Sequence, residues 1–341
     1  MRTYLQRLSE RESLSQEEMR KVMEQILTDE ITDSEIAAFM VGLKTKGETV
    51  EEIVGIVQAL REKALPFKRN IPNVIDNCGT GGDGSKSFNI STTSAFVMAG
   101  AGISVAKHGN RSITSKTGSA DVLEYLGVNW DLQPEVSMEL LEEIGITFLF
   151  APYVHPKIKR IMKVRRDLRI PTVFNLIGPL INPVELDSQL LGLYRRDMLE
   201  MFAEVLKTLG RKRAVVLNGA GYMDEASLAG ENHLAILENG TIRKEILHPE
   251  ELGLSIYDNE AIKGGDSKEN AEILLQVLKG SKGAHRDTVL LNAGIGIYTN
   301  GAASTIKKGI ELAGESIDSG LALGKLQHLV EKSQSYKAGV I

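Results

Sequence analysis

From Val74 onward, short apolar runs that suit β-strands alternate with longer segments of helical periodicity. Alternation of this kind predicts a parallel sheet whose strands are joined by right-handed helical crossovers. The predicted strands are Val74–Asp76, Ile103–Ala106, Thr147–Phe150, Leu190–Leu193, Ala214–Leu217 and Val289–Asn292. The predicted helices are Ala120–Leu126, Glu135–Glu143, Asp197–Leu209, Ala271–Leu278, Ala303–Ala313 and Leu321–Glu331. The fold class that follows is α/β, with a mainly parallel central sheet.

One hairpin is expected to interrupt this scheme. Asn239-Gly240 separates two strand-like runs, His233–Leu237 and Ile242–Ile246. Asn-Gly is the pair that two-residue type I′ turns favour, because both residues tolerate a positive φ. The sequence therefore predicts an antiparallel strand pair at this point.

The first 65 residues predict a separate group of helices. Three segments match the capping box, in which Ser or Thr stands three residues before Glu, and each opens an apolar run at helical spacing. These pairs are Ser15 and Glu18, Thr32 and Glu35, and Thr49 and Glu52. Pro66 and Pro72 then bracket a polar stretch that we interpret as a linker or hinge.

The alternation of strands and helices breaks between Pro152 and Pro183. Lys157–Arg169 is a basic helix inside an acidic protein, and a segment containing Gly178-Pro179 follows it. We expect this region to return to the N-terminal helices. The predicted organisation is a small all-helical domain of residues 1–70, completed by 155–183, hinged to a large α/β domain of residues 71–154 and 184–341.

Two loops that follow consecutive predicted strands carry the residues best suited to ligand binding. The first, Asp76–Gly84, holds four glycines, which free the backbone for positive φ and bring its N–H groups close to a ligand. Asn89–Ser94 then opens a helix whose N-terminus faces this loop and favours an anion. The second loop, Lys107–Ser115, adds the charges of Lys107 and Arg111. We interpret the two loops as one cradle for a multiply phosphorylated ligand.

Other interpretations of the glycine loop are weaker. Gly79–Gly84 formally fits G-x-G-x-x-G, but a dinucleotide site needs an acidic residue roughly 20 residues further on, and the next strand ends in Lys107 instead. A Walker A loop would need Gly-Lys followed by Ser or Thr, which this loop lacks. A purely structural turn rarely needs four glycines before a capped helix.

Acidic residues near the two loops suggest a cation. Asp83 stands among the glycines, where it would repel a bare phosphate unless it binds sugar hydroxyls or a metal ion. Asp224-Glu225 follows a predicted strand on a loop, so both side chains can turn toward one ion. Oxygen ligands without clustered cysteine or histidine favour Mg²⁺ over zinc. A solvated acidic pair is the ordinary alternative, and the residues alone leave both open.

Two further basic features stay ambiguous at this level. His108 is a single histidine, and such residues are more often packing or hydrogen-bonding groups than catalysts. Most charges of Lys157–Arg169 are expected to be solvated. One guanidinium turned inward would suit a substrate carboxylate through a bidentate pair, although composition does not say which one.

The composition excludes several classes of protein. With 42% hydrophobic and 25% charged residues, the 341-residue chain resembles ordinary soluble globular proteins. Its net charge of −5 gives no basic field for nucleic acid or anionic membrane. Cys78 is the single cysteine, which fits a reducing compartment, and no apolar run approaches the roughly 18 residues of a membrane span. We expect a cytoplasmic protein with neither nucleic-acid nor membrane partners.

The chain closely resembles the anthranilate phosphoribosyltransferase family of tryptophan biosynthesis, which has the nucleoside phosphorylase and phosphoribosyltransferase type of fold. The matching segments follow the family's order over most of the chain. They are Gly79–Asp83, Phe88–Thr92, Lys107–Ser112, Gly118–Asp121, Phe148–Pro152, His155-Pro156, Phe174–Leu176, Gly178–Leu180, Asn182-Pro183 and Asp224-Glu225. The resemblance implies transfer of the phosphoribosyl group of 5-phosphoribosyl 1-diphosphate to the amine of anthranilate, with release of diphosphate.

The resemblance also implies roles for individual residues. The phosphoribosyl donor would be held by Gly79, Gly82, Asp83, Ser87, Asn89, Ile90, Ser91, Thr92, Lys107, His108, Gly109, Asn110, Arg111, Ser112, Ile113, Thr114, Ser115 and Ser119. Anthranilate would be contacted by Gly79, His108, Asn110, Arg165, Gly178 and Pro179, with Arg165 on its carboxylate. Mg²⁺, expected as two ions per site, would be ligated by Ser91, Asp224 and Glu225. A homodimer through the helical domain is also implied.

No residue is assigned as an acid or base, because an aromatic amine is already neutral at pH 7. Displacement at the ribose C1 develops negative charge on the leaving diphosphate, so positioning, N–H donors and a cation suffice.

The sequence departs from the family in two places. The family usually has Leu-Gly-x-Arg-Thr before Phe-Asn, where this chain has Leu168–Thr172 with Arg169 and Pro171, and this difference could alter how the helix carrying Arg165 is set. After Asp224-Glu225 the chain has Ala226-Ser227, where the family usually has Ile or Leu before Ser.

Two rival functions remain. A pyrimidine nucleoside phosphorylase would carry a Lys-His-Ser-Thr-Gly-Gly run in its first loop, and this chain does not. A nucleic-acid binder of the same fold would need a basic face, against which the net charge counts.

Overall fold

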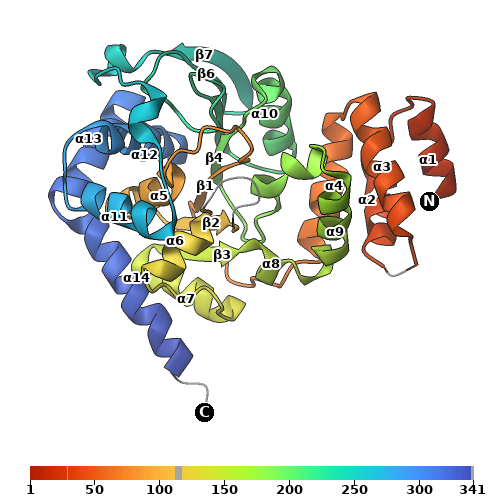
Figure 1. Cartoon of the computed structure of the whole chain (residues 1–341), viewed down its shortest axis with the longest axis horizontal. Coiled ribbons are helices and arrows are strands. Elements are labelled where there is room, and N and C mark those ends of the chain that lie inside the picture. Colours follow the sequence, from red (N-terminus) through yellow and green to blue (C-terminus); the bar gives the residue numbers. More distant parts are fainter. Residues whose placement is uncertain (29, 112–116, 339–341) are drawn as a thin grey trace.

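The computed structural model describes residues 1–28, 30–111 and 117–338, and a group of helices forms a lobe at its N-terminal end (Figure 1). The three predicted capping boxes are confirmed at Ser15, Thr32 and Thr49, where each hydroxyl accepts the N–H of the Glu three residues on. At Gly55, a Cβ would lie 2.4 Å from the Gln16 carbonyl oxygen, so this glycine lets two helices touch. The helices of the lobe are α1 (Arg2–Ser9), α2 (Gln16–Ile26), α3 (Asp33–Lys46) and α4 (Val50–Glu62).

A seven-stranded sheet forms the centre of the larger body. Its order is β3-β2-β1-β4-β5-β6-β7, in which the first five strands are parallel and the last two are antiparallel additions. Asn239 and Gly240 both have positive φ, 51° and 75°, as the predicted type I′ turn requires. The strands are β1 (Ile75–Gly79), β2 (Val105–Gly109), β3 (Ile146–Phe150), β4 (Ser188–Gly192), β5 (Arg213–Asn218), β6 (Asn232–Glu238) and β7 (Thr241–Leu247).

Five of the six strands predicted for the parallel sheet are confirmed, and the sixth prediction is wrong. Val289–Asn292 lies inside a long helix, α12 (Ala284–Asn300), which is buried on nearly every side. A helix without a solvated face has no 3.6-residue alternation of polar and apolar residues. Its apolar core therefore has the composition of a buried strand, and a short window cannot separate the two.

Helices cover both faces of the sheet. Alternate strand residues point in opposite directions, so Val105 and Leu190 join one buried cluster with the helices that follow β1 and β7, while Leu191 and Val216 join another with the N-terminal lobe. The predicted helices are confirmed. They are α5 (Ile90–Gly100), α6 (Ser119–Tyr125), α7 (Pro134–Ile144), α10 (Leu199–Thr208), α11 (Ser267–Leu278), α13 (Ile306–Asp318) and α14 (Leu321–Ala338).

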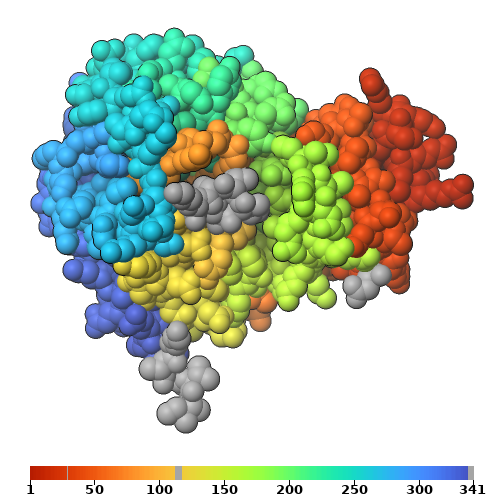
Figure 2. Space-filling view, viewed as in Figure 1, coloured from red at the N-terminus to blue at the C-terminus, as the bar shows by residue number. Residues whose placement is uncertain are grey.

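The segment between β3 and β4 leaves the sheet and lies against the N-terminal lobe (Figures 1 and 2). It contains α8 (Ala151–Val154), α9 (Lys159–Leu168) and short 3-10 helices at Pro156–Ile158, Val173–Asn175 and Gly178–Ile181. Two side chains of α9, those of Arg160 and Lys163, pair with Asp33 at the start of α3 at 2.9 and 2.6 Å. The predicted fold class, a helical domain beside an α/β domain with a mainly parallel sheet, is confirmed. Among the described residues, no helix is long and apolar enough to cross a membrane.

Candidate active site

The two predicted loops meet at the carboxyl edge of the sheet. β1 lies between β2 and β4, so the chain runs to one side of β1 for two strands and then returns to its other side. In open parallel sheets, ligands bind in the crevice at such a switch point. The glycine loop leaves β1 there, and Lys107–Gly109 ends β2 beside it.

An acidic loop reaches the same place from β5. The Gly81 N–H donates to Asp224 Oδ2 at 2.6 Å, and the Ser91 N–H at the start of α5 donates to Glu225 Oε1 at 3.1 Å. The Asp224 N–H in turn lies 3.4 Å from Asp83 Oδ2 of the glycine loop. The structure thus brings together three predicted carboxylates from two loops that are some 140 positions apart.

Two glycines make this approach possible. A Cβ on Gly79 would lie 2.3 Å from Asp224 Oδ2, and a Cβ on Gly192 at the end of β4 would lie 1.6 Å from the Asp224 carbonyl oxygen. Gly81 and Gly82 have φ of 70° and 81°, a region that favours glycine. Backbone freedom and close approach, the predicted reasons for the glycines of the loop, are therefore observed at Gly79, Gly81 and Gly82, whereas Gly192 was not predicted.

The carboxylates of Asp83, Asp224 and Glu225 lie close enough to repel one another when charged. Burial, reinforced by the charges of Asp83 and Glu225, raises the pKa of Asp224 well above its usual value. Burial also raises the pKa of Glu225 to about 7, although Lys107 opposes the shift. A cation placed among these groups would remove the repulsion. The described residues contain no set of three or more His, Cys, Asp or Glu able to hold a metal alone, so further ligands would come from substrate or water.

The start of α5 supplies the other predicted donor-binding groups. Asn89 precedes the first turn, but its side chain does not cap the helix. Its Oδ1 instead accepts a hydrogen bond from Asn270 Nδ2 of α11 at 2.9 Å, which fixes the direction of the amide. Thr92 is buried, while Ser87 and Ser91 are half-buried at the edge of the glycine loop.

The second loop is only partly described. Lys107 is buried and donates from Nζ to the Asn77 carbonyl oxygen at 2.8 Å, and the Asn110 carbonyl oxygen accepts the Ser119 hydroxyl at 3.2 Å. Arg111 forms ion pairs with Asp121 and Glu124, so its charge is directed toward α6. The remaining predicted residues of this loop, Ser112, Ile113, Thr114 and Ser115, lie outside the described residues.

Some of the predicted acceptor-binding residues meet beside β2. His108 Nδ1 lies 3.2 Å from the Gly178 carbonyl oxygen and must carry the proton, because a carbonyl only accepts. Burial, with the neighbouring His155, lowers the pKa of His108 to about 3, so the ring is neutral. Arg165 on α9 is half-buried and donates to Met162 Sδ at 3.1 Å. It makes no hydrogen bond or ion pair with the two loops within the part of the chain that is described.

Comparison with known proteins agrees with this arrangement. Residues 2–64 match the family model described as "Glycosyl transferase family, helical bundle domain", and residues 71–323 match its "a/b domain". An anthranilate phosphoribosyltransferase of Bacillus cereus (strain AH820) is 59% identical over 333 residues, 98% of each chain. The chain belongs to the anthranilate phosphoribosyltransferase family.

Solved structures of family members superpose on this one. The anthranilate phosphoribosyltransferase of Thermus thermophilus has a TM-score of 0.92 at 40% identity, covering 97% of this chain and 99% of its own. The Saccharomyces cerevisiae protein in complex with PRPP and Mg has a TM-score of 0.90 at 26% identity, covering 98% of this chain and 97% of its own. The predicted family resemblance is therefore confirmed.

One residue that holds the acidic loop of this chain was not predicted from the sequence. Asn292, in the middle of α12, accepts the Ala226 N–H at 2.9 Å and donates to the Ala226 carbonyl oxygen at 2.8 Å. Both bonds are made by one buried amide, directly after Asp224-Glu225. A single polar residue within an apolar run was the available signal, and the mistaken strand prediction concealed it.

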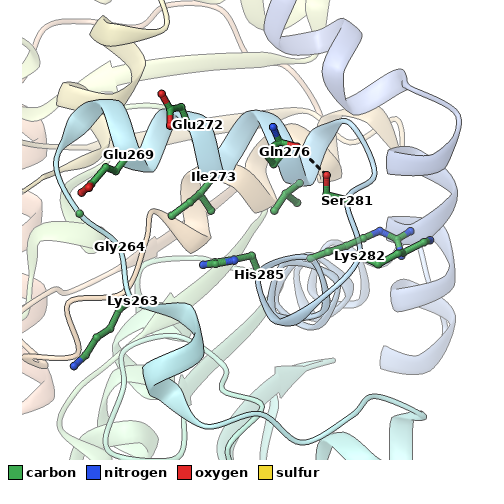
Figure 3. Close-up of a pocket in the computed structure, with 12 residues that line it drawn as sticks. Lys263, Gly264, Glu269, Glu272, Ile273, Gln276, Ser281, Lys282 and His285 are labelled. Carbon is green, nitrogen blue, oxygen red and sulfur yellow. Dashed lines mark hydrogen bonds between the residues drawn. The ribbon is translucent and has the colours of Figure 1, made fainter.

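A cavity of ≈ 600 Å³ lies beside these loops, between α11 and the start of α12, and its labelled side chains are drawn in Figure 3. None of the residues predicted from the family lines it. Its wall nevertheless reaches the segment predicted to bind the phosphoribosyl donor. The His285 ring packs edge-on against Phe88, with 4.9 Å between the ring centroids, and Asn270 links Gly265 to Asn89.

Proposed function

We propose that the protein transfers the 5-phosphoribosyl group from 5-phosphoribosyl 1-diphosphate to the amine of anthranilate, giving N-(5-phosphoribosyl)anthranilate and diphosphate. The observation that carries the proposal is the meeting of the glycine loop, the N-terminus of α5 and the Asp224-Glu225 loop at one edge of the sheet. Family membership over the whole chain supports it. The yeast relative was solved with PRPP and Mg, and also with 4-fluoroanthranilate.

The donor would lie between the two loops. Backbone N–H groups of the glycine loop and the positive end of α5 suit its phosphates. Lys107 supports the glycine loop through the Asn77 carbonyl rather than by reaching into solvent. The other residues that we propose to bind the phosphoribosyl donor are those predicted from the resemblance to the family.

The acidic groups fit Mg²⁺. Asp224 and Glu225 are buried together with raised pKa values, a state that a divalent cation would relieve. We propose that these residues and Ser91 hold Mg²⁺, two ions per site, with the donor's diphosphate completing the coordination. The metal would offset the charge that develops on the leaving diphosphate.

The acceptor would enter beside His108. Its carboxylate would pair with Arg165, and Gly178-Pro179 would line its path. The C1–O bond of the donor breaks with its electron pair going to diphosphate, the amine nitrogen forms the C1–N bond, and the extra proton leaves to solvent. No residue acts as a strong base, and neutral His108 is consistent with that.

The remaining proposals concern organisation. The helical domain would comprise residues 1–70 and 155–183, which the Asp33 ion pairs to α9 support. A homodimer through this domain is supported by apolar surface on it, where Val41 of α3 is 38% exposed and Tyr4 and Leu5 of α1 are half-buried. Val41→Glu should then shift the mass measured by light scattering toward the monomer. A cytoplasmic location belongs to the same proposal.

The test follows the native fluorescence of anthranilate. We expect fluorescence to fall when 5-phosphoribosyl 1-diphosphate and Mg²⁺ are added, and EDTA to prevent the fall. Arg165→Ala should raise the KM for anthranilate, whereas Asp224→Asn should raise the Mg²⁺ requirement. Arg166→Ala, an exposed neighbour on the same helix, serves as the matched control and should change neither.

The outcomes separate the parts of the proposal. Steady fluorescence with a donor that still binds would mean that the acceptor is wrong. Failure of the donor to bind would overturn the two-loop cradle itself.

A further inference from the structure

Three neighbouring strands present buried polar side chains to one segment, Gly178–Asn182. From β2, the His108 ring donates to the Gly178 carbonyl oxygen at 3.2 Å. From β4, Gln189 Nε2 donates to the Pro179 carbonyl oxygen at 2.6 Å. From β1, which lies between them, Asp76 accepts Asn182 Nδ2 at 3.0 Å. We call Asp76, His108 and Gln189 the polar cluster.

Arg211 fixes the orientation of the Gln189 side-chain amide. Arg211 Nε donates to Gln189 Oε1 at 3.1 Å, and a guanidinium has only donors, so the oxygen of this amide must face it. Nε2 is therefore left for the Pro179 carbonyl. Gln189 and Arg211 are 0% and 5% exposed, and burying such polar groups costs free energy unless they are hydrogen-bonded. Arg211 therefore bonds Gln189, and Gln189 bonds the Pro179 carbonyl oxygen.

Asp76 links the segment to the second loop. One carboxylate oxygen accepts a hydrogen bond from the backbone N–H of His108 at 3.2 Å, and the other accepts one from Asn182 Nδ2. The same Asn182 nitrogen donates to the Ala106 carbonyl oxygen at 2.8 Å, one residue before Lys107. A shift of the Gly178–Asn182 segment therefore cannot occur without breaking bonds to β1, β2 and β4.

We propose that the polar cluster sets the position of Gly178-Pro179 relative to the donor loops, and that Gln189, oriented by Arg211, is a positioning residue for an aromatic amine acceptor. This inference rests on the proposed function, in which Gly178-Pro179 lines the acceptor's path. Gln189 itself touches no reacting atom. Its effect is on how tightly the acceptor is held, because a carbonyl left unbound lets the segment move.

The sharpest variant is Gln189→Glu. It keeps the size of the side chain and an oxygen for Arg211, replaces the donor to Pro179 with a carboxylate oxygen, and adds a negative charge next to the Arg211 guanidinium. We expect the KM for anthranilate to rise about tenfold, with the KM for 5-phosphoribosyl 1-diphosphate unchanged within about twofold. Hydrogen exchange of a peptide spanning Gly178–Asn182 should also become faster.

Asn300→Asp is the matched control. This buried amide also bonds residues at the start of β1 and β4, through the Asn73 carbonyl and the Ser188 hydroxyl. Ser188 directly precedes Gln189 in β4, so the two side chains point to opposite faces of the sheet. It should lower the stability of the protein without raising the KM for anthranilate relative to the KM for 5-phosphoribosyl 1-diphosphate. Arg211→Met is a second variant that removes a buried cation and releases the Gln189 amide, and it should raise the anthranilate KM in the same direction.

The inference would be overturned if Gln189→Glu and Arg211→Met both left the anthranilate KM and the hydrogen exchange of the Gly178–Asn182 peptide unchanged. It would also be overturned if the KM values for both substrates rose by the same factor. A wild-type protein that does not consume anthranilate would count against the proposed function instead. Hydrogen exchange, which needs no substrate, would then still decide whether the polar cluster holds the segment.

Discussion

Gly192→Ala should disable the site, although Gly192 itself is not among the predicted ligand-binding residues. Gly192 ends β4 and is buried against the main chain of Asp224. An added Cβ would lie 1.6 Å from the Asp224 carbonyl oxygen and 2.6 Å from its carbonyl carbon. Such contacts are impossible, so the acidic loop must retreat on the order of 1–2 Å.

The size of the effect follows from that displacement. Misplacing a catalytic group by about 1 Å costs on the order of a hundredfold in rate, so kcat/KM should fall by about that factor. Asp224 would also lose its bond to the Gly81 N–H, which ties it to the glycine loop. The Mg²⁺ concentration needed for half-maximal rate should rise. Overpacking should cost about 1–3 kcal/mol of stability, so unfolding is measured to show that the variant is folded at the assay temperature.

The anthranilate fluorescence assay with varied Mg²⁺ measures both effects. Gly324→Ala is the control, because a Cβ there meets no described atom within 4 Å and the position lies in α14. It should leave kcat/KM unchanged. A folded Gly192→Ala protein with wild-type kcat/KM and wild-type Mg²⁺ dependence would refute the placement of Asp224 in the active site.

Three further results are expected. Arg169 ends α9 at φ 54°, in the left-handed region, and is exposed, so Arg169→Gly should stabilise the protein by about 1 kcal/mol in thermal or denaturant unfolding; a lower midpoint would show that the side chain matters. Burial lowers the pKa of His155 to about 4, below its unfolded value of 6.5, so its contribution to stability is present above pH 6.5 and is lost as the pH falls toward 4. Between pH 7 and 5, the free energy of unfolding measured with denaturant should therefore fall by about 2 kcal/mol less in His155→Gln than in the wild type, and equal falls would contradict this. Asn270→Asp would turn a carboxylate toward Asn89 Oδ1, so it should raise the KM for the phosphoribosyl donor about tenfold and leave that for anthranilate unchanged; a shift in the anthranilate KM alone would be contrary to this reasoning.

The parts of the site that could be predicted are those that local sequence determines. The glycine loop leaves the end of β1 and Lys107 lies in the middle of β2, so parallel pairing alone places them near one edge of the sheet. The capping boxes were equally local. Asp224-Glu225 could be recognised as a pair on a loop, but its bonds to Gly81 and Ser91 join residues 143 and 134 positions apart, which no local pattern encodes.

The other features of the site could not be predicted, because they depend on contacts between residues that are distant in the sequence or on the order of the strands. The direction of Arg111 was not predictable, because Asp121 and Glu124 attract a guanidinium that the loop pattern alone would turn toward phosphate. Asn292 was hidden because a helix buried on all sides has the composition of a strand. The polar cluster escaped because Asp76, His108 and Gln189 belong to three different strands, whose order in the sheet the sequence does not state.

The shared packing of the N-terminal helices has a consequence for synthesis on the ribosome. Buried residues of α2 to α4 belong to one cluster with α9, with Phe174 and with strand residues as late as Leu237. At roughly 5–20 residues per second, the chain emerging after α4 needs on the order of ten to thirty seconds to provide those partners. During that time the apolar faces of the first helices remain open to water. The nascent chain is thus expected to present a binding surface for chaperones until much of the sheet has been made.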